Sequence, residues 1–260
     1  MSISQETPRL NSIGQAVLGG ISSLLINGII HPISTMQSCA MANAAVHRMG
    51  LSQLYRGYWA ICATDAAAFG AAYVTNDALS GRLSPLGASI AAGLISAPVI
   101  CVGEGLARNR QVNALPYGQI LERAIRPVGL VTTALREVPF TVAVFCLSPL
   151  LQRQLMHLAG GSDANTPSSV AAQAAAGILA GAVAGLATSP IELIKTRVQT
   201  SEQPLSIAQV VRSVANEGGC RRFFRGGAMR SLYVGLAAAG MNVVNNTAPY
   251  FLPEILHSEE

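Results

Sequence analysis

Charged residues are scarce in this sequence. Of its 260 residues, 12% are Asp, Glu, Lys or Arg, whereas an ordinary soluble domain carries about a quarter. Aromatic residues make up 5%, so the positive mean hydropathy of +0.41 comes from small and aliphatic side chains. Such residues allow helices to pack closely in lipid. A large soluble enzyme core is therefore the weaker interpretation.

Several functional signatures are also missing. The net charge of +4 comes without a basic block interleaved with aromatics, which excludes nucleic-acid binding. There is no glycine-rich phosphate loop, no nucleophile with a base, and no ligand spacing among the four histidines, so we expect no enzyme, cofactor or metal site. The N-terminal residues lack a cleavable leader pattern. The five cysteines are isolated, which argues against disulfides and zinc: Cys39, Cys62, Cys101, Cys146 and Cys220.

Six segments are apolar enough and long enough to cross a bilayer, which takes about 20 residues each. Polar residues inside several of them are typical of helices that line a polar interior. The sequence therefore predicts an all-α membrane protein with one transmembrane domain over residues 1–260. The predicted spans are 12–37, 58–79, 84–107, 128–151, 169–198 and 227–252.

Basic residues are sorted by loop. Twelve of the seventeen lie in the first, third and fifth connections or at the adjoining helix ends, against three on the other side, Arg9, Arg82 and Arg153. This bias predicts that the basic loops stay in the compartment where insertion begins and that both termini lie opposite. The twelve are Arg48, Arg56, Arg108, Arg110, Arg123, Arg126, Lys195, Arg197, Arg212, Arg221, Arg222 and Arg225.

An internal repeat organises these spans. The segments Gly50–Gly57 and Gly219–Gly226 share the pattern G-x4-aromatic-Arg-Gly, and an eroded third copy ends at Gly129. Two spans in three copies predict repeats over residues 12–80, 84–155 and 169–252. Prolines at the basic ends of the odd spans are expected to kink the helices; they are Pro32, Pro98 and Pro190.

The segment Pro190–Gln199 reads PIELIKTRVQ and resembles the P-x-[DE]-x-x-[KR]-x-[KR] signature of the mitochondrial carrier family. The resemblance covers residues 12–252. It implies a three-fold pseudosymmetric barrel of six transmembrane helices around a water-filled cavity. It also implies a monomer in the lipid of the mitochondrial inner membrane that moves a small molecule by alternating access.

The gates of such a carrier are eroded here. The resemblance assigns the matrix-side closure to Glu104, Glu192 and Lys195, with Gln111 and Gln199 beside them, while repeat one supplies only neutral residues. We therefore expect a weak closure, in which Lys195→Gln lowers transport only a few-fold because a wet ion pair contributes about 1 kcal/mol or less. At the opposite gate only Asp77 keeps a charge. The neutral positions there are Ser80, Pro149, Gln152, Asn246 and Pro249.

The resemblance places substrate contacts seven residues after the glycine of each repeat, at Thr64, Arg136 and Tyr233. Arg136 and Glu137 in a membrane helix cost about 2.5–3.5 kcal/mol each. Successive residues on a helix point about 100° apart, so we expect these two side chains to meet different ligand groups rather than each other. Arginine can bind a carboxylate through two parallel hydrogen bonds, and Glu137 can bind an ammonium group. Together they predict an amino-acid-like substrate.

The string Leu135–Phe140 is similar to that of S-adenosylmethionine carriers within the family, which makes S-adenosylmethionine the first substrate to consider. Asp65 would then face its sulfonium or amine, and Tyr233 would stack on its adenine; a solvated acid and ordinary packing are the alternatives. A nucleotide or another metabolite remains a further possibility. A different class of function also stays open, because the eroded gates would suit a membrane receptor or scaffold that no longer transports.

Overall fold

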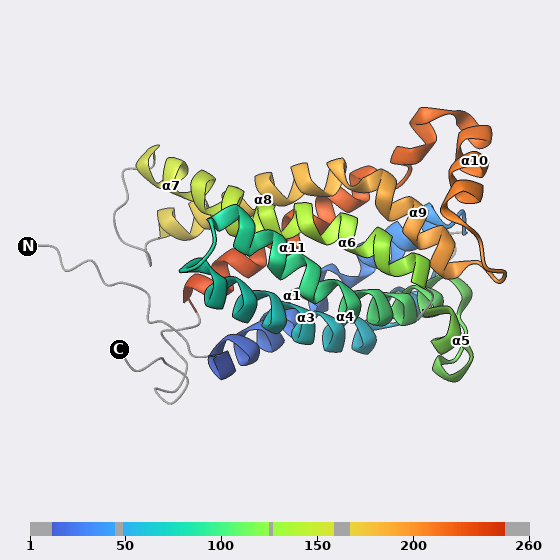
Figure 1. Ribbon diagram of the computed structural model, residues 1–260, viewed down its shortest axis with the longest axis horizontal. Coiled ribbons are helices and arrows are strands. Elements are labelled where there is room, and N and C mark those ends of the chain that lie inside the picture. The colour runs from blue at the N-terminus through green and yellow to red at the C-terminus, as the bar shows by residue number, and fades with distance from the viewer. Residues whose placement is uncertain (1–11, 45–48, 125–126, 159–166, 248–260) are drawn as a thin grey trace, which may run out of the picture.

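The computed structural model describes residues 12–44, 49–124, 127–158 and 167–247, and this part of the chain contains helices and turns but no strand. Long helices run side by side along the molecule (Figure 1). Arg9, Arg48, Arg126 and residues 248–252, used in the predictions above, lie outside the described residues. The long helices are α1 (Ser12–Met41), α3 (Tyr58–Ser80), α4 (Pro85–Asn113), α6 (Pro127–Val142), α7 (Ser148–Leu158), α8 (Pro167–Ala187), α9 (Ser189–Thr200) and α11 (Gly227–Thr247).

These helices close into a ring. Each long helix contacts the next along the chain, and α11 packs on both α8 and α1. Polar side chains bond across the seams: the Ser23 hydroxyl on α1 donates to a carbonyl of α3 at 3.1 Å, and the Thr141 hydroxyl on α6 donates to a carbonyl of α4 at 2.8 Å. The Asn242 amide on α11 donates to a carbonyl of α8 at 3.1 Å. The all-α prediction is confirmed.

The predicted spans and the observed helices differ in two places. The fifth span is two helices, because the chain turns at Thr188, just before Pro190 near the start of α9; proline has no N–H to continue the α8 ladder. The fourth span contains a π-helical turn, Ala143–Leu147, between α6 and α7. Among the residues that the structure describes, four stretches are long and apolar enough to cross a membrane, at 17–41, 85–113, 129–157 and 170–187. The remaining helices α3 and α11 carry more polar residues, including Asp65 and Arg230.

The repeat glycines occupy equivalent places. Gly57 and Gly226 both have left-handed backbones, with φ of +79° and +80°, a region that favours glycine. A Cβ atom on Gly57 would lie 2.9 Å from α4, one on Gly129 3.1 Å from α9, and one on Gly226 3.1 Å from α1. Each glycine therefore packs against the first predicted span of the next repeat, and the glycine of the third repeat packs against the first span of the first repeat.

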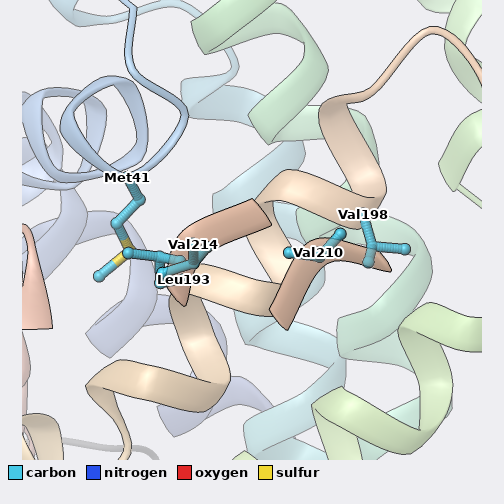
Figure 2. Close-up of a cluster of buried hydrophobic side chains, with 5 residues drawn as sticks. All are labelled: Met41, Leu193, Val198, Val210 and Val214. Atoms are coloured by element: carbon cyan, nitrogen blue, oxygen red, sulfur yellow. The ribbon is translucent and has the colours of Figure 1, made fainter. Parts of the chain in front are cut away.

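The α-helices that are not part of this ring gather at one end of it (Figure 1): α2 (Leu51–Leu54), α5 (Tyr117–Ala124) and α10 (Ile207–Gly218). The start of α1 and the end of α11 lie at the opposite end. An apolar cluster packs α10 against α9 and the end of α1 (Figure 2); it contains Met41, Leu193, Val198, Val210 and Val214.

Ion pairs also connect elements at this end of the ring. Glu217 of α10 accepts hydrogen bonds from Arg197 of α9 and from Arg222. The Arg197 hydrogen bonds are the main reason that the pKa of Glu217 falls to about 2, below its ordinary value. Glu217 therefore stays ionised at every physiological pH.

A glycine stripe on α8 brings this helix close to α11, as its four-residue spacing indicates. A Cβ on Gly177 or Gly181 would lie 2.5 Å from the α11 backbone. We expect Gly181→Ala to lower the free energy of unfolding by about 1–3 kcal/mol, because the helices must move apart, as measured by SDS denaturation followed by circular dichroism. Gly20→Ala on α1 is the control, since its Cβ would meet its nearest neighbour at 3.8 Å. Equal stability of both variants would contradict this packing argument.

Candidate functional site

The ring surrounds a cavity of about 60 Å³. Its lining comes from α1, α3, α4, α6 and α11, so all three repeats contribute. Apolar residues cover most of the wall, and polar groups gather in two places, one on α1 and α3 and the other on α4, α6 and α11. The polar and charged lining residues are Ser23, Asn27, Asp65, Glu104, Arg136, Glu137, Arg230 and Tyr233.

Arg136 and Glu137 both line this cavity and are buried. The prediction that they would not meet each other is wrong: the Arg136 guanidinium donates a charge-assisted hydrogen bond to the Glu137 carboxylate. Backbone geometry separates the two Cβ directions by about 100°, but the long arginine side chain bends back across that angle. The same guanidinium also donates to Glu104 on α4 at 2.8 Å.

A buried central ion-pair network surrounds this pair. Glu104 accepts hydrogen bonds from Arg136, Arg108 and Lys195. Arg108 also bonds Glu192 on α9. Four bases and three acids give the network a charge of +1, and no member is more than 9% exposed. Its seven residues are Glu104, Arg108, Arg136, Glu137, Glu192, Lys195 and Arg230.

The network corrects the expectation of a weak closure. That expectation assumed exposed or wet pairs at Glu104, Glu192 and Lys195, whereas the Lys195 side chain is fully buried. Breaking a buried pair is far more costly than breaking a surface pair, because it leaves an uncompensated charge. All of the network lies on repeats two and three; the corresponding part of α1 carries buried neutral residues such as Ser34 and Gln37.

Of the remaining predicted substrate-binding residues, two line the cavity and one packs between two helices. Asp65 lines the cavity, where its carboxylate accepts a hydrogen bond from the Asn27 amide at 2.8 Å. Tyr233 also lines it and is half-buried. Thr64 is not among the lining residues. It lies at the contact with α4, where a Cβ on Gly103 would clash with its side chain, so in the first repeat the residue after the expected contact faces the cavity.

The predicted gate glutamines are buried. Gln199 donates to the carbonyl of Cys101 at 3.1 Å, while the side-chain amide atoms of Gln111 have no hydrogen-bond partner among the described residues. At the opposite gate Asp77 is exposed near the end of α3. Of the neutral positions there, Pro149 and Gln152 lie on α7, whereas Pro249 lies outside the described residues.

Two network residues were missed as site residues in the sequence. Arg108 follows Glu104 by four residues, so it lies on the same helix face. The sequence analysis counted it only among the basic residues of the loops and helix ends. Arg230 interrupts the apolar start of α11 and lines the cavity. A charge inside a membrane helix is a functional signal in itself, and this signal could have identified Arg230.

Comparison with known proteins finds similarity to mitochondrial carriers over part or most of the chain. Residues 166–254 match the family model for mitochondrial carrier proteins. The S-adenosylmethionine mitochondrial carrier protein homolog of Drosophila melanogaster is 25% identical over 252 residues, covering 86% of this chain and 87% of that protein. Mitochondrial glycine transporter A of Danio rerio is 33% identical over 112 residues, or 43% and 38% of the two chains. A chloroplastic S-adenosylmethionine carrier 2 of Arabidopsis thaliana is 31% identical over 108 residues, or 40% and 30%.

Proposed function

We propose that the chain is a divergent member of the mitochondrial carrier family, which it resembles in sequence, and that it transports a small amino-acid-like metabolite, with S-adenosylmethionine as the first substrate. Members of this family are transporters rather than enzymes. We place the protein in the mitochondrial inner membrane as a monomer; fractionation of mitochondria and plastids tests that location, since one similar carrier is chloroplastic.

The observation that carries the proposal is the Arg136–Glu137 pair on the cavity wall. A buried arginine can bind a carboxylate with two hydrogen bonds, and a nearby glutamate can accept from an ammonium group. A free amino acid presents both groups on one carbon atom. The pair therefore matches the head group of an amino acid and its derivatives.

The opposite side of the cavity suits the rest of S-adenosylmethionine. Asp65 has the Asn27 amide as its hydrogen-bond partner and can face a sulfonium cation. Tyr233 offers a ring for stacking, and Phe69 and Phe140 line the same cavity. A simple amino acid such as glycine would leave this apolar wall uncovered, which favours the larger substrate.

Purified protein tests the proposal directly. We expect S-adenosylmethionine to raise the thermal unfolding temperature of the full chain and to enter liposomes that contain the protein. The reason is that its amino-acid head group and its sulfonium cation can both bind side chains of the cavity. Glycine, glutamate, ATP and a dicarboxylate serve as the comparison set. No stabilisation and no uptake with any of them would favour the receptor or scaffold alternative, and a response to ATP alone would favour the nucleotide alternative.

A further inference from the structure

Two arginines on different helices face the cavity together. Arg136 on α6 and Arg230 on α11 both line it, whereas Glu192 does not and is fully buried. One carboxylate oxygen of Glu192, Oε2, lies 3.6 Å from Nε of Arg136 and 3.5 Å from Nη1 of Arg230. The two guanidiniums therefore share one internal anion, which lies outside the cavity wall.

Neither of these two contacts of Glu192 is a normal hydrogen bond. Both distances exceed the range of a normal N–H···O bond. Nε of Arg136 and Oε2 of Glu192 are buried, and neither has a hydrogen-bond partner among the described residues. The other oxygen of Glu192, by contrast, is held closely by Arg108. Buried polar atoms without partners are unfavourable, so Nε of Arg136 retains capacity for another anion. Nη1 of Arg230 makes only the long 3.5 Å contact with Glu192 among the bonds described above.

Hydrogen bonds to Thr188 hold the Arg230 side chain in its position. Its Nε and Nη2 donate to the hydroxyl of Thr188 at 3.3 and 3.2 Å. Thr188 lies at the break between α8 and α9, four residues before Glu192. Arg230 thus connects the cavity wall to the same segment that carries the internal anion, and the network as a whole keeps a charge of +1.

We infer that Arg136 and Arg230 form one two-arginine site for the carboxylate of a solute, and that Glu192 is the internal anion competing for it. This inference rests on the proposed function, transport of a carboxylate-bearing metabolite, and adds a second binding residue and a competitor. A carboxylate in the cavity supplies the hydrogen bonds that Glu192 does not make. The bound carboxylate also weakens the attraction between the two arginines and Glu192. Because Glu192 lies on α9, the contact of the arginines with this helix is weakened too.

The competition predicts opposite effects for two residues of one network. Glu192→Gln should tighten carboxylate binding about tenfold, since removing a competing charge-assisted contact is worth roughly that factor. Arg230→Gln should weaken binding about tenfold. If both residues served only to hold the fold together, loss of either would weaken binding or leave it unchanged. The sign of the Glu192→Gln effect is therefore the decisive observation.

The experiment titrates S-adenosylmethionine and, separately, formate into the purified full chain and records binding by calorimetry and thermal stabilisation. Formate carries a carboxylate and nothing else, which isolates the two-arginine site from the rest of the substrate. Glu217→Gln and Arg222→Gln are matched controls, because this acid and this base pair with each other and neither lines the cavity. If Glu192→Gln is not recovered folded, Glu192→Asp weakens the same contacts by shortening the side chain and should shift affinity in the same direction.

The outcomes separate the two claims. Tighter binding of both ligands by the Glu192 variant, with weaker binding by Arg230→Gln, supports the inference. Binding of formate in this pattern without any response to S-adenosylmethionine, glycine or glutamate supports the two-arginine site and overturns the proposed substrate class. Unchanged or weaker carboxylate binding in the Glu192 variant, or unchanged binding in Arg230→Gln, overturns the inference. An absence of carboxylate binding in every variant overturns it as well.

Discussion

Replacing Glu104 by glutamine is expected to lower the free energy of unfolding by about 3–5 kcal/mol, the usual cost of removing one partner from a buried ion pair. Glu104 pairs with three cations, Arg108, Arg136 and Lys195. Without it the network falls from three acids and four bases to two acids and four bases. SDS denaturation of the purified protein, followed by circular dichroism, measures the loss.

A second substitution tests whether charge balance is the cause. The ion pair of Lys195 within the described residues is with Glu104, so Glu104→Gln combined with Lys195→Gln restores the original net charge. We expect the double variant to be more stable than Glu104→Gln alone, with a coupling energy of about 0.5–3 kcal/mol. Glu217→Gln, which breaks a surface pair with Arg197, is the control and should cost about 1 kcal/mol or less. Equal losses for Glu104→Gln and the control would show that the buried network adds nothing.

Arg136→Ala is expected to abolish detectable substrate binding, and Arg136→Lys to weaken it by about 1–3 kcal/mol. Lysine keeps the charge but loses the planar fork that matches a carboxylate. Alanine also removes the hydrogen bond that Arg136 donates to Glu137 and takes one cation away from Glu104. Uptake into liposomes and ligand-induced thermal stabilisation, measured for each folded variant, give both effects. Arg153→Ala is the control, because Arg153 is exposed on α7.

Glu137→Gln extends the same test to the amine. A neutral amide cannot balance an ammonium group, so preference should move toward ligands without one, for example from 2-aminobutyrate toward butyrate. Stabilisation that is unchanged in Arg136→Ala would remove Arg136 from the site and, with it, the main reason for expecting an amino-acid-like substrate. An unchanged preference in Glu137→Gln would leave the carboxylate contact intact and reassign the amine.

Local features of the sequence determine most of the architecture. Apolar length and small residues predict the helices, because a chain in lipid must satisfy its backbone hydrogen bonds internally. The four-residue spacing of Gly177, Gly181 and Gly185 predicts one closely packed seam. The repeated G-x4-aromatic-Arg-Gly segments predict equivalent repeats, and the left-handed backbones of Gly57 and Gly226 agree with that equivalence. Each of these properties depends on residues within one helix or one turn, so periodicity and spacing are enough to read them.

The ion-pair network and the cavity depend on how separate helices are rotated against each other, which spacing along the chain does not specify. Glu104 meets Arg136 from 32 residues away and Lys195 from 91. Thr64 turns into a seam because Gly103 leaves room there, and the next residue, Asp65, faces the cavity instead. The sequence alone determined that expensive charges lie inside a helical membrane protein. Only the tertiary structure decided which of them meet, because a rotation of one residue, about 100°, moves a side chain from the cavity wall to a helix seam.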